Sequence, residues 1–259
     1  MAKHELEPRC EMTRHQREAL WVRTHRDEDY RNVWSLTDDP AARDRFVAEL
    51  ASQRVATPIR DVLVPGCGSR VALQNDIATK VPGVRRVLCT DYQGVIDVAR
   101  ERSNDSRVEY AARDSTDLGW CESWDAVVVC NSIVSESDQE NRAILASCRE
   151  ALRPGGILVG FFPTIMCALD IAYRGMPELH ELIDPRRCVF HETKQGIWQV
   201  FYSPLMMRLI LIEAGFILER LEIFFCDSDF AIRQNREYYG IQDPDLPIYE
   251  MFVVARKGR

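Results

Sequence analysis

Short apolar runs alternate along this chain with longer segments of helical periodicity. Five short runs predict strands because most of their residues are apolar. They cover 61–65, 86–90, 107–111, 124–130 and 157–162. The segments between them predict helices over 70–80, 93–102 and 138–152. Strands that alternate with helices build a parallel sheet through right-handed crossovers, so the pattern predicts an α/β fold.

Further elements are predicted on both sides of this alternation. A helix over 40–54 opens at Asp39-Pro40, and a second helix runs from Pro204 to Ala214 and ends at Gly215. After it, 217–226 and 248–256 have the pattern of two strands joined by a long polar loop. The chain shows no internal repeat and no low-complexity segment. One α/β domain with additions is therefore expected.

The first strand runs into a Gly-x-Gly turn, and the second strand is followed by an acid. Gly66 and Gly68 can adopt backbone angles closed to other residues, and they let a ligand lie against the main chain. Asp91 follows the second run, where a carboxylate can accept hydrogen bonds from both hydroxyls of a ribose. A Gly-x-Gly alone is as often an ordinary tight turn. Together with the acid, it predicts a site for a nucleoside-containing cofactor.

Five segments, in order, resemble the motifs of class I S-adenosylmethionine-dependent methyltransferases. They are Val62–Gly68, Asp91–Tyr92, Val108–Ser115, Trp124–Ser132 and Leu152–Leu158. The resemblance covers about residues 55–225. It implies a Rossmann-like, doubly wound sheet of seven mostly parallel strands in three α/β/α layers. It also implies that 217–226 and 248–256 form an antiparallel terminal pair, and that the cofactor is S-adenosylmethionine.

The resemblance also implies which residues bind the cofactor. They are Gly66, Cys67, Gly68, Ser69, Arg70, Asp91, Tyr92, Asp114, Ser115, Asn131 and Ser132. Asp91 takes the place of the ribose-binding acid, and Asp114 that of the acid which meets the adenine amino group. Two positions depart from the family pattern: Val64 stands where an acid is common, and Arg70 where a third glycine is frequent. The Arg70 guanidinium is expected either near the methionine carboxylate or in solvent at a helix start.

Three side chains are candidates for the chemistry. A sulfonium is already activated, so the protein mainly has to align a nucleophile and exclude water. Asn131 follows the fourth strand, and its amide is expected either to orient a nucleophile or a polar group of the cofactor, or to cap a strand-to-helix turn. Tyr173 is either a cation–π partner of the sulfonium or a core or surface tyrosine. Ser203 precedes a proline and is either a pocket residue or the N-cap of the next helix.

Two segments lie outside the expected cofactor core. Residues 1–36 predict a helical arm, which either closes over the cofactor as a lid or packs on the sheet, and 37–259 predict the cofactor-binding domain. The aromatic residues of 13–36 are Trp21, His25, Tyr30 and Trp34. An insertion at 163–203 is placed to roof the substrate pocket, and its short length indicates a small substrate. Within it, His180 and His191 are either general bases or exposed loop residues.

The amino-acid composition limits which substrates and binding partners are expected. A net charge of -7 provides no basic field for phosphates, so a small-molecule substrate is favoured over nucleic acid. The nine cysteines include no Cys-x-x-Cys pair and are typical of reduced thiols in a cytoplasmic protein. No spacing indicates a metal site, no apolar run reaches the length of a membrane span, and the charged start is no signal peptide. A homodimer is left open.

Three functions fit these observations. The favoured one is methyl transfer from S-adenosylmethionine to an O, N or C nucleophile of a small molecule. The second resembles azetidine-2-carboxylate synthases, in which the cofactor's own amine displaces its thioether and methylthioadenosine leaves. Val64 bears on this choice, because without a carboxylate beside the ammonium the amine is easier to deprotonate. The third is a non-catalytic S-adenosylmethionine-binding protein, against which the intact Gly66, Gly68, Asp91 and Asp114 argue.

Overall fold

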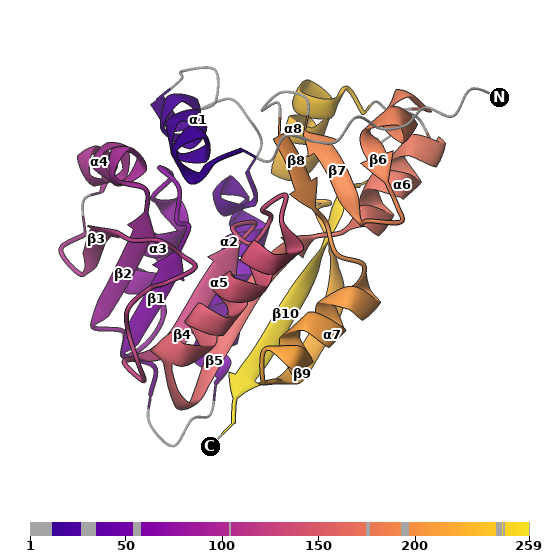
Figure 1. The fold of residues 1–259 in the computed structure, drawn as a ribbon. Helices are drawn as coiled ribbons and strands as arrows, with labels where there is room; N and C mark the ends of the chain where they lie inside the picture. The colour runs from indigo at the N-terminus through magenta and orange to yellow at the C-terminus, as the bar shows by residue number, and fades with distance from the viewer. Residues whose placement is uncertain are drawn as a thin grey trace.

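A seven-stranded sheet in the order β3-β2-β1-β4-β5-β10-β9 forms the centre of the molecule (Figure 1). The computed structural model describes residues 12–26, 35–53, 58–103, 105–174, 177–192, 197–241, 245 and 247–258. Neighbouring strands are parallel except that β10 runs antiparallel to both β5 and β9. The strands are β1 (Asp61–Pro65), β2 (Arg86–Asp91), β3 (Val108–Ala112), β4 (Trp124–Cys130), β5 (Leu152–Pro163), β9 (Phe216–Phe225) and β10 (Tyr249–Lys257). The predicted strand number, the mostly parallel sheet and the antiparallel terminal pair are confirmed.

Helices cover both faces of this sheet and complete the three layers. On one face lie α2 (Pro40–Ser52), α3 (Ala72–Lys80) and α4 (Gln93–Arg102), and on the other α5 (Asp138–Ala151) and α7 (Pro204–Glu213). The side chains of β4 alternate between these layers, because successive residues of a strand point to opposite faces. Ala126 and Val128 join the first core, and Val127 and Val129 the second. The sheet is therefore buried on both sides, as a crossover topology requires.

The insertion at 163–203 folds into a small unit of its own, which we call the cap. It contains α6 (Ile165–Arg174), η3 (Pro177–Leu182) and an antiparallel sheet of β6 (Ile183–Asp184), β7 (Val189–Glu192) and β8 (Ile197–Val200). A separate apolar cluster that includes Ile171, Ile183 and Phe190 holds the cap together. The cap also packs on Ile248, directly before β10, so the cap is fixed to the sheet.

The segment between the last two strands differs from the sequence prediction. Instead of a polar loop alone, it contains the helix α8 (Asp229–Tyr239). Ser228 caps this helix by accepting a hydrogen bond from the Ala231 N–H at 3.1 Å, and Gly240 ends it with a left-handed φ of 70°. The pattern of apolar positions did not predict the helix α8, because most of its residues are polar.

The helix α1 (Arg14–Arg26) lies against α4, above the carboxyl ends of the parallel strands, and the cap lies above the same end of the sheet but on the other side of the molecule (Figure 1). Its approach depends on Gly94, since a Cβ atom there would be 2.7 Å from a methyl carbon of Val22. The predicted arm aromatics Tyr30 and Trp34 lie outside the described residues. This arrangement brings one face of α1 to the ends of the strands.

Candidate functional site

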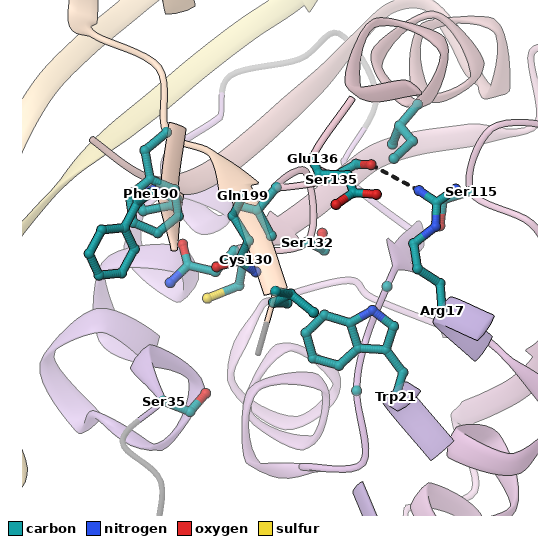
Figure 2. A pocket seen from close by; sticks show the side chains of 18 of the residues that line it. Arg17, Trp21, Ser35, Ser115, Cys130, Ser132, Ser135, Glu136, Phe190 and Gln199 are labelled. Atoms are coloured by element: carbon teal, nitrogen blue, oxygen red, sulfur yellow. Dashed lines mark hydrogen bonds between the residues drawn. The ribbon is translucent and has the colours of Figure 1, made fainter. Parts of the chain in front are cut away.

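A cavity of about 340 Å³ opens at the carboxyl edge of the parallel strands. Strands β1 to β5 end at this edge, and β10 begins there, because Glu250 pairs with Pro163 at the end of β5. The helix α1 and the cap form the remaining walls, as Figure 2 shows with Trp21 on one side and Phe190 on the other. The volume lies within the range of about 300 to 1,000 Å³ that is typical of small-molecule sites.

The ends of β1, β2 and β3 form one wall, which we call the strand side. Its members are Gly66, Cys67, Gly68, Arg70, Asp91, Tyr92, Arg113, Asp114, Ser115 and Thr116. Gly66 and Gly68 have φ values of 62° and 64°, a region that favours glycine. A Cβ on Gly66 would lie 2.6 Å from the Cβ of Ser132. The loop after β1 therefore has to present bare backbone to the cavity.

Asp91 holds that loop in place. One carboxylate oxygen accepts a hydrogen bond from the Gly68 N–H at 2.9 Å, and the other accepts one from the Tyr92 N–H at 2.7 Å. Burial raises the pKa of Asp91 to about 6, although both N–H groups act in the opposite direction. Each oxygen keeps a further lone pair, so the carboxylate can accept two more hydrogen bonds from a ligand in the cavity.

Asp114 is fixed in a similar way at the end of β3. Its Oδ1 atom accepts hydrogen bonds from the N–H of Thr116 at 2.9 Å and from the hydroxyl of Thr116 at 2.7 Å. This local turn is typical of an Asp that follows a strand. Both strand-side carboxylates are thus oriented by the turns in which they lie, before any ligand binds.

Asn131 and Glu250 form a hydrogen-bonded pair in the wall of the cavity. Asn131 follows β4 with a φ of 52°, a left-handed conformation that Asn tolerates better than most residues. Its side-chain N–H donates to Glu250 Oε1 at 2.8 Å. In the part of the chain that the structure describes, Asn131 Oδ1, Ser132 Oγ and Glu250 Oε2 are buried without a hydrogen-bond partner. Such unpartnered atoms are costly unless a ligand or water satisfies them.

Glu250 is the residue that the sequence prediction missed. It is 2% exposed, and burial raises the pKa of its carboxyl to about 7 despite the hydrogen bond from Asn131. The sequence carries one signal for it, since an acid opens an otherwise apolar strand that continues from Met251 to Ala255. Its partner Asn131 lies 119 positions away in the sequence, so only the fold brings the pair together.

A second wall, the cap side, comes from α6, η3, the cap sheet and the start of β10. Its members are Thr164, Cys167, Ala168, Ile171, Leu179, Phe190, Ile197, Trp198, Gln199, Phe201, Ile248, Tyr249 and Glu250. The rings of Phe190 and Phe201 stack with their centroids 5.2 Å apart. Among these residues Glu250 is the one with a formally charged side chain at pH 7. This wall therefore combines apolar and aromatic surface with a single carboxyl group.

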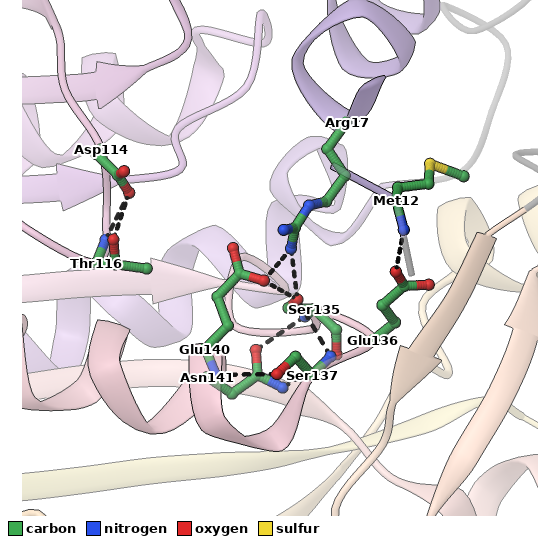
Figure 3. A network of polar contacts seen from close by, with 9 residues as sticks. All are labelled: Met12, Arg17, Asp114, Thr116, Ser135, Glu136, Ser137, Glu140 and Asn141. Carbon is green, nitrogen blue, oxygen red and sulfur yellow. Dashed lines mark hydrogen bonds and ion pairs between the residues drawn. The ribbon is translucent and has the colours of Figure 1, made fainter. Parts of the chain in front are cut away.

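The helix α1 is tied across the cavity by polar contacts at its N-terminal end. The Arg17 guanidinium donates to Ser135 Oγ at 3.0 Å and forms an ion pair with Glu140 (Figure 3). The backbone N–H of Met12 donates to the Glu136 carboxylate at 2.9 Å. These contacts join α1 to the turn between β4 and α5, so α1 covers the cavity from above the strand ends.

At its other end, α1 places His25 on the glycine turn. A Cβ on Gly68 would lie 3.2 Å from the His25 ring, and His25 Nδ1 lies 3.0 Å from Ser69 Oγ. Burial, together with the charges of Arg70 and Arg102, lowers the pKa of His25 to about 4. The imidazole is therefore neutral at neutral pH.

Most predicted cofactor residues line the cavity. The ones that do are Gly66, Cys67, Gly68, Arg70, Asp91, Tyr92, Asp114, Ser115, Asn131 and Ser132. Ser69 is the exception, because it is buried, with its hydroxyl against His25 and 3.2 Å from Nη1 of Arg102. Arg70 lines the cavity and its guanidinium pairs with Asp38, so it is not the solvated arginine of one alternative. Its place near the methionine carboxylate stays a prediction.

Two of the three predicted catalytic side chains lie outside the cavity wall. Ser203 accepts a hydrogen bond from the Met206 N–H at 3.3 Å and caps α7, which satisfies a free donor at the helix start. Tyr173 is 77% exposed and its ring lies against His180 at 4.8 Å. His191 stacks on Trp198 at 4.5 Å, and neither histidine lines the cavity. Asn131 alone remains in a position to reach a reacting group.

The described residues offer no obvious metal-binding cluster. No three of their His, Cys, Asp and Glu side chains are grouped so that they could hold a metal ion.

The thiols of Cys67 and Cys130 at the cavity have raised pKa values. The largest cause is a hydrogen bond to Cys89 at Cys67, and burial at Cys130. Both thiols are therefore protonated at neutral pH.

None of the helices described here has the length and apolar character to cross a membrane.

Comparisons with known proteins agree with this architecture. Residues 62–156 match the family model of the methyltransferase domain. No curated protein matches the chain in sequence. A chain of the complex between the Haloferax volcanii Trm112 methyltransferase activator and a methyltransferase is 18% identical, with a TM-score of 0.62 over 96% of this chain and 98% of that chain.

Two further solved structures have a similar fold. The N-methyltransferase NodS from Bradyrhizobium japonicum, in complex with S-adenosyl-L-homocysteine, is 18% identical, with a TM-score of 0.60 over 93% of this chain and 98% of that chain. A S-adenosylmethionine-dependent methyltransferase from Methanosarcina mazei is 14% identical, with a TM-score of 0.61 over 82% of this chain and 97% of that chain. At these identities the likeness shows the fold.

Residues 62–156 match the methyltransferase domain, from β1 into β5. The strand order of the sheet is that of the methyltransferase fold of these solved structures. The domain match supports an enzyme that transfers methyl groups, and it implies S-adenosylmethionine as the methyl donor.

Glu250→Gln tests whether the buried Glu250 carboxylate lacks an interaction that offsets the cost of burying its charge. Because the folded-state pKa of about 7 lies above the ordinary value of 4.5, the unfolded chain loses this proton first, and Glu250 destabilises the fold increasingly between those two pH values. We expect the substitution to raise the free energy of unfolding at pH 8 by up to about 3 kcal/mol and to change it little at pH 4.5. Urea denaturation at both pH values measures this.

The matched control is Glu49→Gln, a buried glutamate outside the cavity that forms an ion pair with Arg220. Loss of that pair should lower the free energy of unfolding at pH 8, which is the opposite sign. If Glu250→Gln also lowers stability at pH 8, the carboxylate has a compensating partner and the reading of this site is wrong.

Proposed function

We propose that this enzyme methylates a small molecule, with S-adenosylmethionine on the strand side of the cavity and the acceptor on the cap side. One observation carries the proposal: a single cavity connects the bare glycine turn and the two oriented carboxylates with the apolar wall under the cap. Asn131 lies between the two walls, at the end of the central strand β4. We expect the reacting methyl group to lie there, between the strand side and the cap side.

The strand-side residues fit this cofactor in kind. Gly66 and Gly68 line the cavity with backbone alone, because a Cβ there would press on Ser132 or His25. Asp91 has lone pairs to spare for the two hydroxyls of a ribose. Asp114 would meet the adenine amino group at the next strand end. When bound, the sulfonium supplies an activated methyl group, so the chain has to supply orientation and a dry site.

The positions of α1 and the cap over the cavity support water exclusion by these two elements. Trp21 points into the cavity from α1 (Figure 2), and the Arg17 contacts hold α1 over the turn after β4. We infer that α1 acts as the lid expected from residues 1–36, since ligands could enter when it moves away. The cap is held by its own apolar cluster and would stay in place.

The size and charge of the cavity support a small acceptor. At about 340 Å³, the cavity lies near the lower end of the range for small-molecule sites, which favours a compact acceptor over a polymer. The net charge of -7 offers no general attraction for nucleic acid. A homodimer and a cytoplasmic location stay predictions from the sequence.

Cyclisation of S-adenosylmethionine stays the alternative. Val64, on which that hypothesis rests, is buried and does not line the cavity, so nothing from its side chain reaches the ligand. We expect no methylthioadenosine when the purified protein is incubated with S-adenosylmethionine alone and the products are analysed by mass spectrometry. Its release together with a four-membered cyclic amino acid would refute methyl transfer as the main reaction.

Asp91→Ala tests the cofactor assignment. Loss of charge-assisted hydrogen bonds should weaken binding of S-adenosylhomocysteine by about 1 to 3 kcal/mol, which is about 5- to 150-fold in Kd. Isothermal titration calorimetry measures this. Asp97→Ala is the control, because Asp97 is a solvent-facing carboxylate on α4 that does not line the cavity. Equal affinities for the two variants would remove Asp91 from the ligand site.

A further inference from the structure

We propose that the methyl acceptor is an amine with an apolar body, and that Glu250 and Asn131 bind its nitrogen while Glu250 takes up its proton. The proposal rests on the proposed function and deepens it, because it assigns the acceptor class of the same cavity. It concerns residues that the sequence motifs do not include. Four observations support it: the unpartnered atoms, the charge of the wall, its aromatic lining and the balance of protons.

The two unpartnered oxygens of the Asn131–Glu250 pair are acceptors, so a ligand satisfies them by supplying hydrogen-bond donors. A carboxylate only accepts hydrogen bonds, so the side chain of Asn131 turns its N–H to Glu250 Oε1 and leaves its own carbonyl oxygen facing elsewhere. Asn131 Oδ1 and Glu250 Oε2 are both acceptors that have no partner in the described structure. A nitrogen with two or more N–H groups has a proton for each of these two acceptors, whereas a hydroxyl has a single proton to give.

The charge of the cap side selects against anions. Glu250 is the one formally charged side chain among the cap-side residues, and no cationic side chain accompanies it there. A carboxylate or phosphate acceptor would bring a second negative charge into a poorly solvated space, which is strongly unfavourable. An ammonium ion has the opposite effect, because it compensates the buried carboxylate.

The aromatic lining fits the same ligand. Phe190, Trp198, Phe201 and Tyr249 belong to the wall that contains Glu250. Aromatic faces attract cations, most strongly where water is excluded, and they also pack against an apolar body. A carboxyl group with aromatic neighbours is thus suited to an amine that carries a hydrocarbon or ring.

The proton balance gives Glu250 its role in the reaction. The amine can attack only through its lone pair, so an ammonium first gives one proton to the Glu250 carboxylate. The lone pair then forms the new N–C bond, and the C–S bond breaks with both electrons remaining on sulfur, which becomes a neutral thioether. The product nitrogen holds one positive charge, as the sulfonium did before. A pKa of about 7 lets the carboxyl accept and release this proton near neutral pH.

The experiment supplies the full chain with S-adenosylmethionine and a panel of matched compounds. The panel contains benzylamine, 2-phenylethylamine and cyclohexylmethylamine, each with its alcohol and its carboxylic acid counterpart. Mass spectrometry detects the methylated products and S-adenosylhomocysteine. We expect N-methylated products from the amines, formed at least about tenfold faster than products from the matched alcohols and acids.

Glu250→Gln keeps the shape of the side chain and removes its charge and basicity. We expect kcat/KM for the amine to fall by about 100-fold or more, the size expected for a lost general base. In the wild type, kcat/KM should rise with pH through about 7, and the variant should lack this step. The Kd of S-adenosylhomocysteine should stay within about twofold. Glu49→Gln, a buried glutamate outside the cavity, should keep wild-type amine kinetics.

Several results would overturn the proposal. It is wrong if no amine of the panel is methylated, if alcohols or acids react as fast as the amines, or if Glu250→Gln keeps its activity. A large loss of S-adenosylhomocysteine affinity in Glu250→Gln would place the carboxyl against the cofactor's own ammonium instead. Each of these outcomes leaves cofactor binding by the wild type intact. Failure of the wild type to bind S-adenosylhomocysteine would instead refute the proposed function.

Discussion

The reversal of strand order between β1 and β4 is the constraint on which the site depends. To one side of this point the chain returns through helices on one face of the sheet, and to the other side through helices on the opposite face. The loops after β1 and β4 therefore separate, and a crevice forms between them. Gly66 and Ser132 flank that crevice so closely that a side chain on Gly66 would collide with Ser132. Every other wall of the cavity is added around it.

The added walls differ in chemistry because they come from different parts of the chain. The strand side is polar, since it consists of turns whose carboxylates are held by backbone N–H groups. The cap side is apolar, since it consists of the cap's own packed core and the start of a buried strand. Glu250 breaks this rule, and burial of its carboxyl costs stability. A costly group that faces a cavity is more consistent with a ligand-binding role than with a role in folding.

The sequence predicted the parts of the site that are encoded locally. The glycine turn and Asp91 follow their strands directly, so the pattern of apolar runs was enough to place them. The pair of Asn131 and Glu250 was not predictable in this way, because the two residues are 119 positions apart and meet only through the order of the strands. Ser203 was encoded locally as well, because the N-cap role that its position before Pro204 indicates is the one the structure shows. The cap sheet escaped prediction because its strands are as short as Ile183–Asp184.

A crystal structure of the protein with S-adenosylhomocysteine tests the central claim most directly. The claim is that one cavity holds the cofactor on the strand side and leaves the cap side for the acceptor. The account predicts that both ribose hydroxyls lie about 3 Å from the Asp91 carboxylate and that the thioether sulfur faces the space beside Asn131 and Glu250. A nucleoside that lies under the cap, or a sulfur that faces away from Glu250, would contradict it.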